Sequence, residues 1–283
     1  MKNIYMIGIG LIGGSFAIDF KKHNPEVVIH GISRKDETLN KALELNLIDK
    51  KATLDDLEKA DLVVISIPVD ATVKLLPTIL DKISDNTLVV DAGSTKEAIC
   101  KVVEHHKRRR NYLACHPIAG TENSGPTAAI SGLYKGKTNI ICEVEKTTFK
   151  LQEKALELFR AIGMRIRYMD PVSHDKHIAY VSHLSHISAF MLGKTVINKE
   201  KNERDIFDMA GSGFASTVRL AKSSPAMWTP IFKQNKENVI ETLEEYINNL
   251  QQFKELMQQD NFSEIFNEME NTNYIKQILN GIK

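Results

Sequence analysis

Residues 2–32 read KNIYMIGIGLIGGSFAIDFKKHNPEVVIHGI and combine two apolar runs with one helical pattern. The apolar runs, residues 2–8 and 27–32, predict two strands, and residues 15–22 predict the helix between them. The first strand leads into the helix through the spacing Gly-x-Gly-x-x-Gly, at residues 8–13. This strand–turn–helix–strand context is what makes the glycine spacing typical of a dinucleotide-binding fold.

Each glycine of the turn has a separate physical role in such a fold. Gly8 permits a tight turn, Gly10 lets the backbone approach a pyrophosphate, and Gly13 lets the helix pack closely on the strand. The helix N-terminus then faces the phosphates. A glycine-rich turn that binds no nucleotide is the alternative, and the flanking elements argue against it. We therefore expect the cofactor to contact Gly8, Gly10, Leu11, Ile12 and Gly13.

The same alternation of strands and helices continues to Met169. Apolar strand patterns at residues 62–66, 87–91, 112–115, 138–142 and 165–169 alternate with helical patterns at residues 69–82, 95–107 and 149–162. This order predicts an α/β fold of the Rossmann type, with a doubly wound parallel sheet. The sequence therefore predicts a dinucleotide-binding domain at residues 1–169.

The rest of the chain has a helical pattern. Asp170-Pro171 is a strong helix start, because Asp is a favoured N-cap residue and Pro is favoured at the first helical position. Long amphipathic patterns follow, including apolar residues at helical spacing from Val239 to Met257. We expect residues 170–283 to form an all-α domain that binds substrate and dimerises, since long amphipathic helices often complete their burial against a second chain.

Composition limits the class of protein. The 283 residues suit about two domains, and 42% apolar with 26% charged residues is ordinary for a globular protein. Lys and Arg total 37 and Asp and Glu total 36, so the formal net charge of +1 gives no case for nucleic acid or an anionic membrane as a partner.

The location of the protein is predicted from its cysteines and its apolar runs. Three widely spaced cysteines suit neither a disulfide framework nor a zinc site, which favours a reducing cytoplasm. No apolar run reaches the roughly 18 residues of a membrane span. The glycines near the N-terminus and Asp19 argue against a signal peptide there.

The choice between NAD and NADP depends on the end of the second strand. An acidic residue there would bind the ribose 2′-hydroxyl of NAD, but the chain has Ser33, followed by Arg34 and Lys35. A hydroxyl with two cations favours a 2′-phosphate slightly, whereas a solvated basic turn beside Asp36 is the alternative. Both cofactors stay open, with a slight preference for NADP, and we expect Pro68, after the next central strand, to contact either one.

Polar residues that follow the later strands are the candidates for catalysis. Ligands bind outside the carboxyl ends of parallel strands, which places Ser94 and His116 at one rim of the sheet. His116 is a natural general base near neutral pH, beside a nicotinamide that accepts hydride. A strand-end hydrogen bond is the alternative for His116, and a capping box with Glu97 is the alternative for Ser94.

The helical half supplies further polar candidates. His183 and His186 lie three residues apart and share a helix face, which predicts a wall of the substrate cleft. No carboxylate or cysteine accompanies them at ligand spacing, so we predict no metal site. His174 could instead be a buried histidine with a structural hydrogen bond. Arg219 could clamp a carboxylate in a bidentate manner, or it could be a surface cation.

Five segments together resemble the prephenate dehydrogenase family of tyrosine biosynthesis, over nearly the whole chain. They are the glycine loop GIGLIGGS, then DAGSTK, HPIAGTE, SHLSH and GFASTVRLAKSSPAMW. The resemblance implies oxidative decarboxylation of prephenate to 4-hydroxyphenylpyruvate with NAD or NADP. It implies that His116 takes the proton of the ring hydroxyl, that Ser94 orients this hydroxyl and the nicotinamide, and that Arg219 binds a carboxylate. It further implies that the pocket is lined by His186, His183 and Glu122.

Some positions depart from the family pattern. Ser212 interrupts a run of glycines, and Ala215-Ser216 replace a common Arg-Asp pair. These changes fall where the substrate side chain would bind, so arogenate is an alternative to prephenate. A reductase of another substrate on the same two-domain plan is a second alternative, and a non-catalytic dinucleotide sensor is a third.

Overall fold

A computed structural model describes residues 1–201, 203 and 205–281. Two compact units are present: the first is Met1–Asn235, and the second begins at Lys236. The first unit contains a sheet with the strand order β3-β2-β1-β4-β5-β6-β7-β8. Its strands are β1 (Asn3–Ile7), β2 (Val28–Ile32), β3 (Lys50–Lys51), β4 (Leu62–Ile65), β5 (Leu88–Asp91), β6 (Tyr112–Pro117), β7 (Thr138–Cys142) and β8 (Arg165–Met169).

The sheet is parallel from β3 to β6, as the sequence predicts for a Rossmann-type fold. Two features differ from the expected pattern. β7 runs antiparallel to β6, while β8 is again parallel to β7. The two-residue strand β3 has no apolar run, because both of its lysines are exposed at the sheet edge, so periodicity gives no signal for it.

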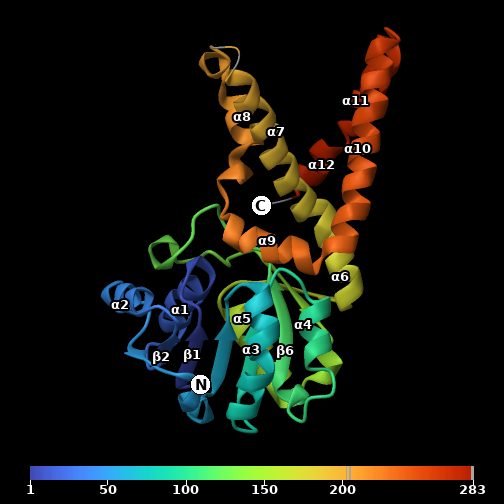
Figure 1. The fold of residues 1–283 in the computed structure, drawn as a ribbon. Coiled ribbons are helices and arrows are strands. Elements are labelled where there is room, and N and C mark those ends of the chain that lie inside the picture. Colours follow the sequence, from blue (N-terminus) through green and yellow to red (C-terminus); the bar gives the residue numbers. More distant parts are fainter. Residues whose placement is uncertain (202, 204, 282–283) are drawn as a thin grey trace. The chain divides into compact units, whose positions relative to one another are not determined.

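Helices cover both faces of the sheet (Figure 1). They are α1 (Leu11–His23), α2 (Asp36–Glu44), α3 (Val69–Lys82), α4 (Glu97–Val102) and α5 (Phe149–Ala161). Alternate side chains of β1 enter two separate cores: Ile4 and Met6 pack on one face, while Tyr5 and Ile7 pack on the other. Burial on both faces explains why the central strands are apolar without alternation.

One helix in this half is shorter than its sequence pattern. The pattern at residues 95–107 predicts a long helix, but α4 occupies only Glu97–Val102. The N-cap position of α4 is Lys96, and the expected capping box between Ser94 and Glu97 does not form. A capping box between Thr53 and Asp56 is present at the start of the 3-10 helical turn Leu54–Lys59.

The remaining helices of the first unit follow β8. They are α6 (Pro171–Ile178), the π-helical segment η5 (Ala179–His183), α7 (Leu184–Glu200), α8 (Ser212–Thr217) and α9 (Pro225–Gln234). Asp170 caps α6 by accepting a hydrogen bond from the backbone N–H of Ser173, as the Asp-Pro start predicts. Helices α6, η5 and α7 follow each other directly, and a π-helical turn within a long helix frequently marks a functional site.

The second unit consists of helices. They are α10 (Lys236–Gln258), α11 (Phe262–Thr272) and α12 (Ile275–Asn280). Asn261 caps α11 through a hydrogen bond from the backbone N–H of Glu264. Among the helices of the described chain, none is both long enough and apolar enough to cross a membrane.

Candidate active site

The glycine loop at the carboxyl end of β1 is shaped by steric exclusion. Gly8 has φ +92°, and a Cβ there would lie 2.6 Å from the carbonyl oxygen of Ser66. A Cβ on Gly13 would lie 2.2 Å from the carbonyl oxygen of Gly8. The Ser66 hydroxyl also donates a hydrogen bond to this Gly8 oxygen, at 2.7 Å. The loop therefore packs directly against the end of β4.

Gly10 differs from the other two glycines because a Cβ on it would meet no neighbour closer than 3.9 Å. Helix α1 starts immediately after Gly10, has no side-chain cap and has no acidic residue in its first turn. Open space in front of uncapped backbone N–H groups suits a diphosphate. The loop therefore fits a dinucleotide, with Leu11 and Ile12 in the first turn of the helix that would face its phosphates.

The other predicted cofactor residues lie at the same rim of the sheet. Ser33 follows β2 directly, and its Oγ accepts a hydrogen bond from the backbone N–H of Lys35 at 3.2 Å. Arg34 and Lys35 are exposed, and the neighbouring Asp36 pairs with Lys51 at 3.3 Å. Pro68 occupies the N-cap position of α3, at the carboxyl end of β4.

His116 lies near the end of β6 and is largely buried. Its Nδ1 lies 2.8 Å from Nε2 of His174, and Nδ1 of His174 lies 2.7 Å from a carboxylate oxygen of Asp175. Burial, and to a lesser extent the neighbouring His174, Lys96 and His183, hold the pKa of His116 well below its usual value. The imidazole is therefore neutral near pH 7, as a general base must be.

A buried ion pair supports the rim beneath His116. Lys96 and Asp91 are fully inaccessible and pair through Nζ and Oδ2, and Nζ also donates to the carbonyl oxygen of Cys115 at 2.6 Å. Burial acts to lower the pKa of Lys96, but the Asp91 carboxylate outweighs it and the net pKa is raised. Asp91 also accepts hydrogen bonds from the Tyr112 hydroxyl at 2.7 Å and from the Gly93 N–H at 2.8 Å. This network fixes the backbone on both sides of Ser94 and immediately before His116.

Ser94 lies half-buried between β5 and α4. Its predicted structural role as a helix cap is wrong, because Asp175 caps α4 instead. The backbone N–H groups of Lys96 and Glu97 donate to the two carboxylate oxygens of Asp175, at 2.7 Å and 3.0 Å. The Ser94 hydroxyl is therefore not used in the cap.

His183 and His186 lie near the junction of η5 and α7. His183 is fully buried, and its Nδ1 accepts a hydrogen bond from the Asn235 amide at 3.2 Å, while its Nε2 has no partner among the described residues. Burial lowers the pKa of His183 to about 4. His186 is half-buried and stacks on Trp228 with ring centroids 3.7 Å apart. The edge of His183 faces the same indole at 5.8 Å.

Arg219 begins the short helical turn η7 (Arg219–Lys222) and pairs with Glu122, which lies in the loop after β6. The guanidinium Nη1 lies 2.8 Å from the Glu122 carboxylate, and half of the Arg219 side chain is exposed. A backbone hydrogen bond and the Arg219 charge lower the pKa of Glu122. Burial, partly offset by the Ser182 carbonyl, and the Arg219 charge together lower the pKa of His186.

The structure thus brings the predicted residues into two linked groups. In the first group, His174 and His183 both help to lower the pKa of His116. In the second group, Arg219 helps to lower the pKa of His186 and donates a hydrogen bond to Glu122. Sequence analysis missed the roles of Asp175, Lys96, Trp228 and Asn235. The adjacent pair His174-Asp175, shortly after the Asp170-Pro171 helix start, is a sequence signal that could have pointed to Asp175. No local signal points to Lys96, Trp228 or Asn235, because their burial depends on how the elements pack.

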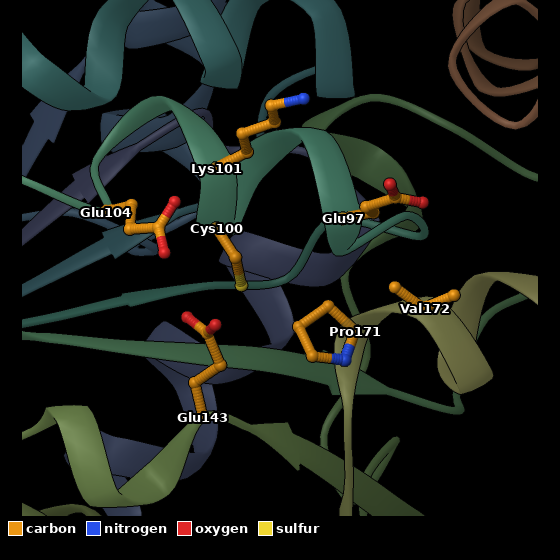
Figure 2. Close-up of a pocket in the computed structure, with 7 residues that line it drawn as sticks. All are labelled: Glu97, Cys100, Lys101, Glu104, Glu143, Pro171 and Val172. Atoms are coloured by element: carbon orange, nitrogen blue, oxygen red, sulfur yellow. The ribbon is translucent and has the colours of Figure 1, made fainter.

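One hollow in the described chain lies away from these residues. Figure 2 shows one of about 210 Å³, lined by Glu97, Cys100, Lys101, Glu104, Glu143, Pro171 and Val172. None of these is a predicted site residue. Within residues 1–201, 203 and 205–281, no three His, Cys, Asp or Glu side chains gather as metal ligands would.

The glycine loop, the largely parallel sheet and the imidazole at its rim define the chain as a dinucleotide-binding protein of the Rossmann class. Two family models match it: the nucleotide-binding domain of prephenate dehydrogenase over residues 16–168 and the dimerization domain of prephenate dehydrogenase over residues 170–271. The chain belongs to the prephenate dehydrogenase family.

Individual relatives agree with this assignment. The prephenate dehydrogenase of Bacillus subtilis (strain 168) is 31% identical over 270 residues, which cover 93% of this chain and 72% of the relative. A prephenate dehydrogenase from Aquifex aeolicus, solved with hydroxyphenyl propionate and NAD+, superimposes with a TM-score of 0.90 at 31% identity over 99% of this chain and 98% of that one. Synechocystis arogenate dehydrogenase gives a TM-score of 0.76 at 25% identity over 97% and 99%.

Proposed function

We propose that the chain catalyses the oxidative decarboxylation of prephenate to 4-hydroxyphenylpyruvate, with hydride transfer to NAD or NADP, in tyrosine biosynthesis. The observation that carries the proposal is the buried, neutral His116 at the same sheet rim as the glycine loop. The ligands of the A. aeolicus structure, a hydroxyphenyl acid and NAD+, resemble the product and cofactor of this reaction.

The proposed role of His116 is proton transfer at Nε2, since Nδ1 is engaged by His174. It takes the proton of the substrate hydroxyl as the ring carbon loses hydride, for which a bound nicotinamide would be the acceptor. Loss of the ring carboxylate as carbon dioxide leaves its electron pair in the ring, which becomes aromatic. His116 then returns a proton to the phenolate oxygen, so no net proton is released. Ser94 orients the hydroxyl beside the cofactor.

Arg219 is the proposed anchor for a substrate carboxylate, because a guanidinium binds carboxylates in a bidentate manner. His186 and Glu122 line the same pocket. His183 is fully buried, so we place it behind the wall formed by His186 and Trp228. The cofactor contacts are those of Gly8, Gly10, Leu11, Ile12, Gly13 and Pro68, with the basic turn Ser33-Arg34-Lys35 giving a slight preference for NADP.

Two further proposals concern the organisation of the chain. We place the domain boundary between residues 169 and 170, with dinucleotide binding before it and substrate binding and dimerisation after it. Exposed apolar side chains in the second unit support a homodimer: Ile247, Leu250, Met257, Phe262, Phe266 and Met269. The three cysteines are free and buried, which suits the reducing cytoplasm.

The test is the absorbance of reduced nicotinamide after mixing the protein with prephenate and either cofactor. We expect prephenate-dependent reduction, and the His116→Asn variant should bind cofactor normally but lose about three orders of magnitude in kcat. Absence of reduction with both cofactors would refute the proposal. Arogenate is the second candidate substrate, supported by the likeness to the Synechocystis enzyme, and the same assay with arogenate distinguishes the two.

A further inference from the structure

Three buried side chains from two distant parts of the first unit, one of them the proposed catalytic imidazole, are joined by successive hydrogen bonds. His116 comes from β6, while His174 and Asp175 come from α6. Nδ1 of His116 meets Nε2 of His174 at 2.8 Å, and Nδ1 of His174 meets Oδ1 of Asp175 at 2.7 Å. His174 and Asp175 are 1% and 2% exposed, so solvent cannot replace these bonds.

The hydrogen bonds fix the direction of the line. Asp175 already accepts from the backbone N–H groups of Lys96 and Glu97, so it acts as an ionised acceptor. His174 must therefore carry its proton on Nδ1 and leave a lone pair on Nε2. This lone pair accepts a hydrogen bond from the Nδ1–H of His116. The free lone pair of His116 is therefore on its other ring nitrogen, Nε2. This is the tautomer that a general base facing substrate requires.

We propose that His174 and Asp175 are positioning residues that hold His116 in this tautomer and accept its proton during turnover. The inference rests on the proposed function. When Nε2 of His116 takes the substrate hydroxyl proton, the proton on Nδ1 passes to Nε2 of His174. The positive charge then lies on His174, in contact with the Asp175 carboxylate, and the reverse transfers return the proton to the phenolate.

The surroundings of His116 explain why such a transfer is useful. Lys96 approaches from the loop before α4, His174 from α6, and His183 from η5, and burial together with these neighbours disfavours a charge on His116 itself. An isolated buried imidazole is therefore a weak base. A charge on His174 is adjacent to a carboxylate, and opposite charges in contact at low dielectric attract strongly.

The first test is the His174→Gln variant, assayed for kcat and KM across pH. Glutamine can still accept from His116 and donate to Asp175, but it cannot take a proton. We expect kcat to fall at least tenfold, KM for prephenate and NAD to change less than about threefold, and the acidic limb of the kcat profile to move to lower pH. The matched control is His177→Gln, at an exposed position of the same helix, which should behave as wild type. A His174→Gln enzyme within twofold of wild-type kcat and with an unmoved limb would overturn the inference.

The second test is Asp175→Asn, whose amide can donate to His174 and so reverse both tautomers. We expect kcat to fall about 100-fold or more, and the double variant with His174→Gln to be no slower than the worse single variant, because the residues act as one unit. Multiplicative losses would contradict the relay.

Nitrogen-15 NMR of the histidines in the wild-type protein provides a readout that needs no substrate and no variant. We expect the neutral His116 to be protonated on Nδ1. Protonation on Nε2 would overturn the inference by itself. If the expected tautomer is found but neither prephenate nor arogenate reacts, the proposed function fails while the assigned positioning holds.

Discussion

The guanidinium of Arg219 and the carboxylate of Glu122 lie 2.8 Å apart, although 97 residues separate them in the sequence. The resemblance to the family implied each residue as a separate contact for substrate. If Arg219 binds a substrate carboxylate as proposed, that carboxylate must compete with Glu122 for the same guanidinium. The exposed half of the Arg219 side chain leaves room for this exchange.

Replacing Arg219 with Gln should weaken substrate binding and leave hydride transfer largely intact. A hydrogen bond to a charged group contributes about 1.5–3 kcal/mol, so we expect KM for prephenate to rise roughly 10–100-fold. Steady-state kinetics with saturating cofactor measures this change. The control is Lys222→Gln, at an exposed cation of the same turn, for which KM should change less than about threefold. An equal rise in both variants would indicate a general electrostatic effect and no specific clamp.

Two glycines of the loop should respond differently to the same substitution. In Gly13→Ala the Cβ would meet the Gly8 carbonyl oxygen at 2.2 Å, which only a backbone shift can relieve. We expect a loss of about 1–3 kcal/mol in the free energy of unfolding, seen as a lower Tm in thermal denaturation.

In Gly10→Ala the Cβ meets nothing closer than 3.9 Å, so the Tm should stay within about 1 °C of wild type. The new methyl group would stand where the diphosphate approaches, so the Kd for NAD should rise about tenfold or more in calorimetry. A Gly10→Ala protein with unchanged cofactor affinity would disprove the assigned binding position.

Ser33→Asp should change the preference between cofactors. A carboxylate at the end of β2 repels a 2′-phosphate but can accept a hydrogen bond from the ribose 2′-hydroxyl of NAD. We expect Kd for NADP to rise at least about tenfold relative to Kd for NAD. Ser33→Asn, which has nearly the same size and no charge, should leave the ratio near the wild-type value. Equal changes in both Kd values for Ser33→Asp would defeat the 2′-phosphate argument.

His183 should make the protein less stable in acid. Its folded-state pKa of about 4 lies below the usual value of 6.5, so the unfolded chain binds the proton more readily. The contribution of neutral His183 is therefore fully present above pH 6.5 and is lost as pH falls from there toward 4. The shift corresponds to about 3 kcal/mol over that range.

The comparison that isolates His183 is the His183→Asn variant, which can still accept the hydrogen bond from the Asn235 amide. We expect its Tm to fall less steeply than that of wild type between pH 6.5 and 4. His30, His116 and His186 also have lowered pKa values and serve as a common background in both proteins. Parallel Tm curves for the two proteins would show that His183 does not cause the acid sensitivity.

Local sequence patterns are enough to predict the Rossmann-type fold and the position of the glycine loop. Apolar strand patterns, glycine spacing and the Asp170-Pro171 cap are local signals, because backbone sterics and hydrogen bonding act over a few residues. The sheet order follows from the rules of parallel crossovers, and these place His116 and Ser94 at one rim. Local patterns gave no sign of the reversed direction of β7 or the early end of α4.

Which side chains meet at that rim depends on contacts between residues that are distant in the sequence. His116 lies 58 residues from its partner His174, and Arg219 lies 97 from Glu122. Whether a carboxylate caps a distant helix, as Asp175 does for α4, depends on how α6 packs against the sheet. This packing is determined by the burial and shape of many residues together, so no short sequence pattern predicts it.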